Sequence, residues 1–341
     1  MKTKRAVSLK DLAKELGVSI STVSRALKNS SEIGEDTKMK IRALAKERGY
    51  RPNPFAMSLL KNTPRIIGIL VPDIVTHFYS SIISGISAVA RRNGYSTIVS
   101  SSFEEYAKEK ECIEDLVNIR VEGIIACLTQ ETTDFAHFEE LYHQNIPLVL
   151  FDRVCLSDKI SSVVTNNIAS AKLATMHLLE TGSKRVAFLG GSNNLQIVKE
   201  RKHGYLEALR QYKMLIEREL VCCDEIGYEA GYKGGIELLS QSNPPDAILG
   251  MTDSLTFGAM KAIYEKGLRI PDDIAVVGYT DELHCDYTNP PLTGMTHQTY
   301  KMGEVACDLL LKQLKGDSQV FQETIPCVLE VRGSSFKIKT P

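Results

Sequence analysis

The stretch from Ser8 to Asn29, SLKDLAKELGVSISTVSRALKN, carries the signals of two short helices separated by a tight turn. Ser8 and Asp11 are spaced to satisfy the free N–H groups of a first helical turn, and apolar residues then recur at three- and four-residue steps. Gly17 predicts the end of this helix, and Ser19 predicts the cap of a second one. Two short helices joined by a glycine-containing turn form a helix-turn-helix, which places its second helix in the DNA major groove.

A glycine-turned helix pair also occurs in helical proteins that bind no DNA, so this pattern alone leaves both interpretations open. The stretch that follows, SEIGEDTKMKIRALAKERGYRPNPFAMSLLKN, predicts a third helix and then a break at Pro52-Asn53-Pro54, because proline does not fit inside a helix. Asn53 and Pro54 suit the start of a further helix of about two turns, which is too short to be stable alone.

Basic residues are concentrated in this N-terminal part. Residues 1–62 contain 14 lysines and arginines against 6 acidic residues, whereas the whole chain contains 41 and 42. The remaining residues therefore carry an excess of acidic groups. This asymmetry is typical of a nucleic-acid-binding segment attached to a body that would not bind a polyanion by itself.

The composition, 43% hydrophobic and 24% charged, is that of an ordinary globular protein. No signal-peptide core follows the basic start, and no apolar run is long enough to span a membrane, so we expect a cytoplasmic protein. The eight cysteines and seven histidines match no metal-binding spacing, and no nucleophile elbow or phosphate-binding glycine loop is present. We therefore expect no catalytic site, no metal and no cofactor.

From Arg65 onward, continuous apolar runs alternate with helical patterns. The runs are RIIGILVP, YSTIVSSS, VEGIIACL, IPLVLFD, KRVAFLGG, DAILGMTD and IAVVGYTD. Apolar strands alternating with helices predict parallel sheets covered on both faces. The number of units favours two doubly wound sheets, with a break near residues 164–167.

Ligands of doubly wound folds bind beyond the carboxyl ends of the strands, so the residues after each run are the candidates. The candidates are Asp73, Phe78, Tyr79, Asp152, Arg153, Arg201, Thr252, Asp253, Thr280 and Asp281. Aromatic rings, carboxylates and an arginine suit a polyhydroxylated ring, because rings stack on its apolar face and charged groups bind its hydroxyls.

The words GVSISTVSRAL, GYRPN and AMSL, in this order and at these distances, resemble the DNA-binding headpiece of the LacI/GalR family of bacterial transcriptional regulators. The resemblance implies a small all-α headpiece (1–62) with a hinge helix at about 53–61. It also implies an α/β body like periplasmic binding proteins (63–341), made of two doubly wound parallel-sheet subdomains. In that fold the chain crosses back near 292–298, which places 63–164 and 296–330 in one subdomain and 165–292 in the other.

The resemblance further implies a sequence-specific regulator, expected to be a repressor, that binds a pseudo-palindromic operator as a homodimer and responds to a small-molecule effector. Ile20, Ser21 and Arg25 are the candidates for base contacts, and Leu59 would act as a wedge in the minor groove. The phosphate candidates are Ser8, Ser19, Ser24, Lys28, Thr37 and Tyr50. Lys10, Thr22, Asn53 and Ala56 complete the predicted DNA-binding set.

In the body, Arg201 matches the family's effector-binding arginine, while Asp152, Phe78 and Tyr79 match residues that face the ligand. Thr252 and Thr280 depart from the family's usual amide or carboxylate at those places, and a hydroxyl cannot replace a two-pronged contact. The effector is therefore expected to be a sugar or a sugar derivative, and these departures disfavour an unmodified hexose of the usual kind. The basic residues beside Arg201 suggest an acidic or phosphorylated sugar; they are Lys199, Lys202 and His203.

Two other functions remain open. A protein corepressor could control the same body in place of a sugar. A sugar-binding protein without a regulatory role, or a sugar enzyme, is a further alternative, against which the basic headpiece and the absence of a signal peptide argue.

Overall fold

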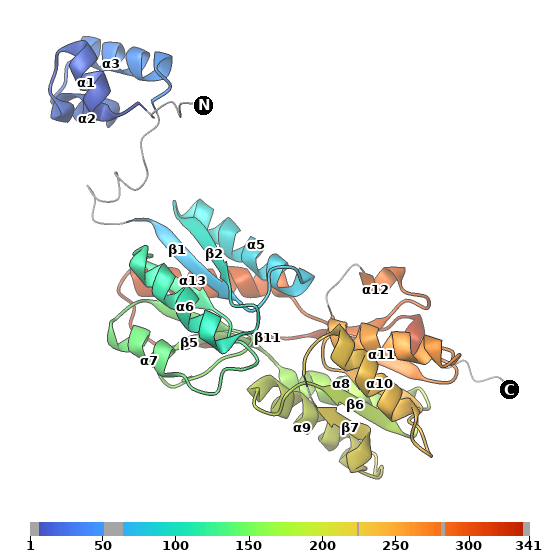
Figure 1. Cartoon of the computed structure of the whole chain (residues 1–341). Coiled ribbons are helices and arrows are strands. Elements are labelled where there is room, and N and C mark those ends of the chain that lie inside the picture. The colour runs from blue at the N-terminus through green and yellow to red at the C-terminus, as the bar shows by residue number, and fades with distance from the viewer. Residues whose placement is uncertain (1–6, 51–63, 224, 281–283, 337–341) are drawn as a thin grey trace. The chain divides into compact units, whose positions relative to one another are not determined.

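The computed structural model describes residues 7–50, 64–223, 225–280 and 284–336 (Figure 1). The chain divides into two compact units, Met1–Pro64 and Arg65–Pro341, which we call the headpiece and the body. Within the described ranges, no helix has both the length and the apolar character needed to cross a membrane.

The described part of the headpiece contains three helices, α1 (Leu9–Leu16), α2 (Ile20–Leu27) and α3 (Glu35–Glu47). The reciprocal cap predicted for α1 is present. Ser8 Oγ accepts a hydrogen bond from the Asp11 N–H at 3.3 Å, and the Asp11 carboxylate accepts one from the Ser8 N–H at 2.8 Å. These contacts fix the first turn of α1.

The turn between α1 and α2 also follows the predicted signals. Gly17 ends α1 with a φ of 65°, a left-handed conformation that glycine adopts at low cost. Ser19 Oγ then accepts a hydrogen bond from the Thr22 N–H at 3.0 Å and caps α2. The predicted helix-turn-helix is therefore confirmed.

One side chain from each helix fills the centre of the headpiece. Leu12, Val23 and Ile41 are at most 1% exposed. Because the apolar residues of each short helix share one face, the three helices can bury them only against one another. The predicted hinge helix, and with it Asn53, Ala56 and Leu59, lies outside the described residues.

The body consists of two lobes, each built around one sheet. In the described part of the first lobe, six parallel strands follow the order β11-β5-β4-β3-β1-β2. Their bounds are β1 (Ile66–Val71), β2 (Ser96–Ser101), β3 (Gly123–Ala126), β4 (Leu148–Phe151), β5 (Ser161–Thr165) and β11 (Gln322–Ile325).

Helices cover both faces of this first sheet (Figure 1). Ile67 and Ile69 point to one face, where they pack with α5 (His77–Arg92) and α13 (Thr299–Leu314). Leu70 points to the other face and packs with α6 (Tyr106–Asn118) and α7 (Ala136–His143). Burial on both faces is the reason why the central strands read as continuous apolar runs.

The described strands of the second lobe follow the order β12-β10-β9-β8-β6-β7, parallel except for β12. Their bounds are β6 (Val186–Gly190), β7 (Val221–Cys223), β8 (Ala247–Gly250), β9 (Ala275–Tyr279), β10 (Thr293–Thr296) and β12 (Val328–Glu330). The α-helices are α8 (Asn167–Glu180), α9 (Gln196–Gln211), α10 (Tyr228–Leu239), α11 (Asp253–Glu265) and α12 (His284–Tyr287), and the short 3-10 helices are η1 (Arg218–Leu220) and η2 (Gly333–Ser335). The predicted fold of two doubly wound parallel sheets is confirmed.

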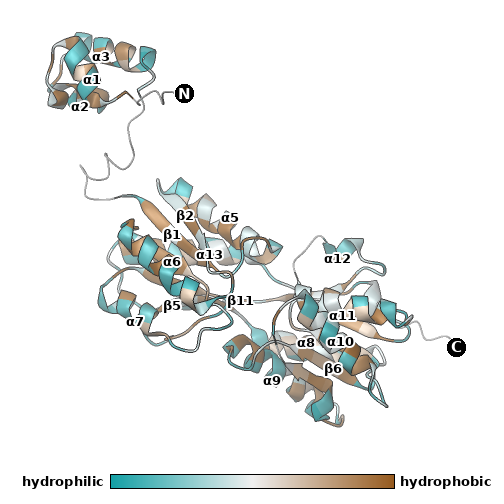
Figure 2. Cartoon of the chain, viewed as in Figure 1, coloured by the Kyte–Doolittle hydropathy of each residue, from teal (hydrophilic) through white to brown (hydrophobic). Residues whose placement is uncertain are grey.

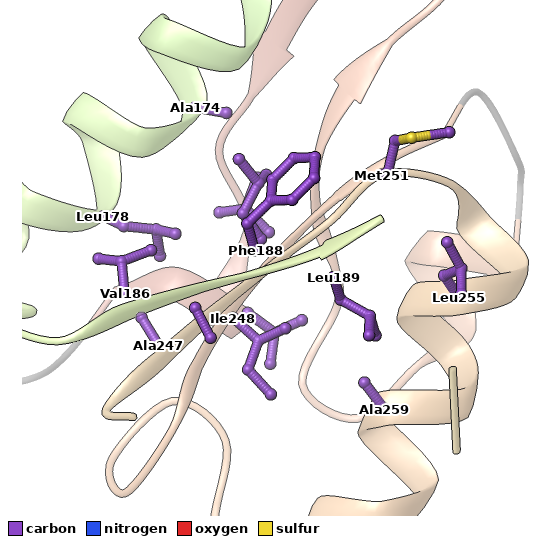
Figure 3. Packing of buried hydrophobic residues seen from close by; sticks show 14 of the residues in the cluster. Ala174, Leu178, Val186, Phe188, Leu189, Ala247, Ile248, Met251, Leu255 and Ala259 are labelled. Carbon is purple, nitrogen blue, oxygen red and sulfur yellow. The ribbon is translucent and has the colours of Figure 1, made fainter. Parts of the chain in front are cut away.

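Along the strands of the second lobe, successive core residues point to opposite faces of the sheet. Figure 3 shows Phe188 near Leu178 of α8, whereas the next residue, Leu189, lies near Ala259 of α11. Successive strand residues point to opposite faces, so one strand contributes to both layers. Figure 2 shows the same arrangement as apolar strands between helices whose outer faces are hydrophilic.

The predicted subdomain boundaries need correction at two places. Strand β10 at 293–296 still belongs to the second sheet, so that lobe does not end at 292. Only α13 and β11 of the final segment join the first lobe, whereas β12 at 328–330 pairs antiparallel with β10. The two last strands therefore lie in different sheets. Their pairing depends on partners distant in the sequence, which a short exposed run such as VLE does not reveal.

Two glycines allow α5 and α13 to pack backbone against backbone. A Cβ on Gly85 would overlap the carbonyl oxygen of Tyr300, and a Cβ on Gly303 would overlap that of Ile82. The two helices can therefore keep their present separation only with glycine at both positions.

We predict that Gly85→Ala lowers the free energy of unfolding by about 1–3 kcal/mol, although alanine is the better helix former, because the new methyl group must push the helices apart. Urea denaturation measures this change. Ser84→Ala, on the exposed side of the same helix, is the matched control and should change stability by less than about 0.5 kcal/mol. Equal stability of Gly85→Ala and the parent would contradict the close packing.

Candidate functional site

A cavity of about 340 Å³ lies in the body, between loops that follow strands of the first sheet and loops that follow strands of the second. Ligands of doubly wound folds bind at this place, and the volume is in the usual range of ligand sites. Nine of the predicted effector residues line it: Asp73, Phe78, Tyr79, Asp152, Arg153, Arg201, Thr252, Asp253 and Thr280. Asp281 lies outside the described residues.

Several residues that line the cavity were not predicted from the sequence. Phe103 and Glu104 follow β2, and Ile226 and Gly227 follow β7. The first pair could have been found, because β2 is among the predicted strands and the residues after it follow the same rule. Strand β7 has only three residues and gives no strand signal. His297 follows β10, in a segment that the sequence marks only as a chain crossing.

Three contacts fix the guanidinium of Arg201, which is 3% exposed and belongs to α9. Its Nε donates a hydrogen bond to Asn167 Oδ1 at 2.9 Å, and its Nη1 donates one to the carbonyl oxygen of Met251 at 2.6 Å. The guanidinium carbon also stands 3.9 Å from the centre of the Tyr279 ring. Arg201 is thus a preorganised positive group at the cavity wall, which reduces the entropy lost when a ligand binds.

Asp152 follows β4 directly and is 5% exposed. Its φ of 57° is a left-handed conformation that residues other than glycine rarely adopt and that is found at functional sites. Burial raises the pKa of the Asp152 carboxyl, while the charges of Arg153 and Arg201 act in the opposite direction. Among the described residues, none donates a hydrogen bond to this carboxylate. Asp152 is therefore able to accept hydrogen bonds from a ligand.

The neighbouring Arg153 has hydrogen-bond acceptors for its Nη1 but none for its Nε. Its Nη1 donates to Glu104 Oε2 at 2.8 Å and to the carbonyl oxygen of Leu128 at 3.3 Å. Its Nε is buried and has no hydrogen-bond partner within the described residues. A buried donor without an acceptor costs about 1–3 kcal/mol.

The two threonines that depart from the family's usual pattern use their hydroxyls inside the protein. Thr252 Oγ1 accepts a hydrogen bond from the Leu255 N–H at 3.3 Å and caps α11. Thr280 Oγ1 lies 3.1 Å from Cys285 Sγ. A threonine hydroxyl does not offer the cavity a two-pronged contact.

Aromatic rings form a further part of the lining. The Phe78 ring centre lies 5.1 Å from that of Tyr79 and 5.2 Å from that of His297. The His297 ring lies 5.7 Å from that of Tyr279. Burial, and then the charge of Arg201, lowers the pKa of His297 well below its ordinary value, so its imidazole is neutral. Rings of this kind can stack on the apolar face of a sugar.

The charges of the lining disfavour an anionic ligand. Four carboxylates face two guanidiniums, and the six residues are Asp73, Glu104, Asp152, Asp253, Arg153 and Arg201. The basic residues that suggested an acidic or phosphorylated sugar do not line the cavity. Lys202 Nζ donates to Asn193 Oδ1 at 2.7 Å, His203 pairs with Glu207 at 3.2 Å, and Lys199 is exposed. These three residues therefore do not support an acidic or phosphorylated ligand.

In the headpiece, α2 presents one exposed face opposite its buried Val23 and Ala26. Ile20, Ser21, Arg25 and Lys28 are exposed. Arg25 Nη1 donates to Glu32 Oε2 at 2.7 Å, and because both side chains are exposed this ion pair is weak and can be exchanged for a DNA base.

The remaining predicted DNA-binding residues differ in their surroundings. The hydroxyl oxygens of Ser8 and Ser19 accept the capping hydrogen bonds of α1 and α2, and the Ser8 O–H also donates to Asp11 Oδ2 at 2.6 Å. Lys10 is exposed, whereas the others are half-buried: Thr22, Ser24, Thr37 and Tyr50.

Comparison with known proteins assigns both units. The model of the lacI family of bacterial regulatory proteins matches residues 8–53, and the model of a periplasmic binding protein-like domain matches residues 175–335. The chain is 33% identical over 310 residues to the HTH-type transcriptional regulator RegA of Clostridium saccharobutylicum, which covers 91% of this chain and 93% of that protein.

Two further similarities extend over nearly the whole chain. The HTH-type transcriptional repressor CytR of Escherichia coli (strain K12) is 29% identical over 336 residues, 98% of each protein. The structure of the Lac repressor dimer bound to operator and the anti-inducer ONPF is 26% identical with a TM-score of 0.86, and covers 97% of this chain and 99% of that one. The chain therefore belongs to the lacI family of bacterial regulatory proteins, and it is a sequence-specific DNA-binding transcriptional regulator.

Proposed function

We propose that this regulator represses transcription from the cytoplasm as a homodimer on a pseudo-palindromic operator, and that a small neutral polyhydroxylated molecule, a sugar or sugar derivative, controls it from the cavity of the body. The observation that carries the effector class is the carboxylate of Asp152 at the end of β4. It lines the cavity, and among the described residues none donates a hydrogen bond to it.

A hydroxyl group suits this carboxylate, because it donates a hydrogen bond. A ring that carries adjacent hydroxyls can donate to both carboxylate oxygens of Asp152. The excess of carboxylates in the lining supports a neutral ligand over a phosphorylated or acidic one. A cavity of small-molecule size also favours this effector over a protein corepressor.

The dimer follows from the size of the DNA-reading surface. A single helix-turn-helix contacts too few base pairs for specificity in a genome, whereas two copies related by twofold symmetry read two half-sites. The similar Lac repressor structure is a dimer bound to its operator. Ile20 and Ser21 are proposed to contact base edges by methyl groups and shape, and Arg25 to contact a guanine.

We predict that the full chain binds at least one neutral sugar among D-ribose, D-glucose and cellobiose more tightly than D-glucuronate or glucose 6-phosphate, as isothermal titration calorimetry measures. Asp152→Asn should weaken that binding by about 10- to 100-fold, because one ligand hydroxyl loses its charged acceptor. Asp158→Asn, an exposed position of the following loop, should leave the affinity unchanged. Tight binding of glucose 6-phosphate without binding of any of the neutral sugars would contradict the proposal of a neutral effector.

For the headpiece, we predict different consequences at Arg25 and Lys28. On an operator selected from random duplexes with the parent protein, Arg25→Ala should cost about 1–3 kcal/mol and relax sequence preference at one position of each half-site. Lys28→Ala should weaken binding to all sequences alike and reduce the slope of log affinity against log salt by about 1. Fluorescence anisotropy titrations at several salt concentrations measure both effects. Unaltered sequence preference in Arg25→Ala would refute the base contact.

A further inference from the structure

Three segments carry the described chain between the two lobes of the body. Asn166 lies between β5 and α8, His297 and Gln298 lie between β10 and α13, and Pro326 and Cys327 lie between β11 and β12. Each segment leaves one sheet and enters the lobe of the other. A change in the angle between the lobes must therefore bend all three.

Side chains join these segments to one another. The Cys327 N–H donates to Asn166 Oδ1 at 2.9 Å, and Gln298 Nε2 donates to the carbonyl oxygen of Pro326 at 3.1 Å. Cys327 Sγ lies 3.3 Å from His297 Nδ1. We call the set Asn166, His297, Gln298 and Cys327 the hinge brace. It connects every crossing to another crossing, so the three cannot bend independently.

The protonation states agree with a hydrogen bond between the thiol and the imidazole. Burial raises the pKa of the Cys327 thiol to about 11, so the sulfur keeps its proton. Burial and the nearby Arg201 lower the pKa of His297 well below its ordinary value. A neutral imidazole and a protonated thiol leave one proton for this contact, so either the Cys327 S–H donates to His297 Nδ1 or the Nδ1–H donates to the sulfur.

His297 is the member of the brace that lines the cavity. It is 6% exposed, and its ring lies between an aromatic ring of each lobe, Phe78 of the first and Tyr279 of the second. A ligand in the cavity that touches this imidazole therefore contacts the same side chain that holds the crossings together.

We propose that His297 is the positioning residue of the effector response: the bound effector contacts its imidazole, and the imidazole holds the hinge brace that sets the angle between the lobes. A ligand shifts a conformational equilibrium only through contacts that differ between the two states, and His297 offers one such contact. The ligand part of this inference rests on the proposed function, whereas the brace itself is independent of it.

The angle between the lobes can be measured directly in the full chain. Paramagnetic labels on noncanonical residues at Glu111 of α6 and Arg210 of α9, both exposed, report the distance between the lobes by double electron–electron resonance when labelled chains are diluted with unlabelled chains, so that one subunit of a dimer carries labels. We expect a distance distribution in His297→Ala that is about twofold broader than in the parent, because the crossing at 297–298 loses its contact with Cys327 and keeps only that of Gln298 with Pro326. Circular dichroism checks that each variant is folded.

Conservative variants separate the brace from a general loss of packing. His297→Asn places an oxygen near the position of Nδ1, and Cys327→Ser keeps a donor, so both should retain the narrow distribution. Cys327→Ala should broaden it as much as His297→Ala does. A folded His297→Ala or Cys327→Ala with the parent's distribution would overturn the brace.

Addition of D-ribose, D-glucose and cellobiose tests the effector contact. A sugar that binds the parent by calorimetry should shift its distance distribution, and at saturation the same sugar should leave that of His297→Ala unshifted. An equal shift in both proteins would overturn the role of His297. Absence of binding by every sugar would overturn the proposed effector class, while the ligand-free comparison of the variants would still decide whether the brace exists.

Discussion

In the body, the burial of both sheets between helices determines where polar side chains can lie. Helices cover both faces of each sheet, so the strand interiors must be apolar, and polar side chains can gather only beyond the strand ends. Asp152 and Arg201 come from different lobes and meet there as buried charges. Their mutual attraction reduces the cost of burial, but unsatisfied groups remain, and a ligand can satisfy them.

Local sequence patterns determined most of what could be predicted. The caps at Ser8 and Ser19, and the nine cavity residues that follow strand ends, depend on a few neighbouring positions and on a general rule of the fold. The sheet to which β12 belongs depends instead on a distant partner, β10. His297 escaped the prediction for the same reason, because its importance arises from Cys327, Phe78 and Tyr279, which only the folded chain brings beside it.

The structure of the cavity also changes the interpretation of Thr252 and Thr280, the two positions that differ from the family's usual pattern. Thr252 and Thr280 suggested an unusual sugar because they lack the amide or carboxylate expected at their places. Their hydroxyls have partners inside the protein, and we propose that Asp152 supplies the polar recognition instead. Basic residues near Arg201 on α9 made an acidic ligand plausible, yet the lining itself has more carboxylates than guanidiniums. A neutral polyhydroxylated ligand agrees with both observations.

Thermodynamic linkage between the cavity and the operator is tested most directly by four affinities on one protein. Calorimetry gives the affinity of the bound sugar for the free protein and for the operator complex, and fluorescence anisotropy gives the operator affinity with and without saturating sugar. Because each subunit of the homodimer has one cavity, we predict that the ratio of the operator affinities equals the product of the sugar-affinity ratios at the two sites, with a total coupling of about 5- to 150-fold. A sugar that binds tightly in the cavity but leaves the operator affinity unchanged would contradict control of DNA binding through this site.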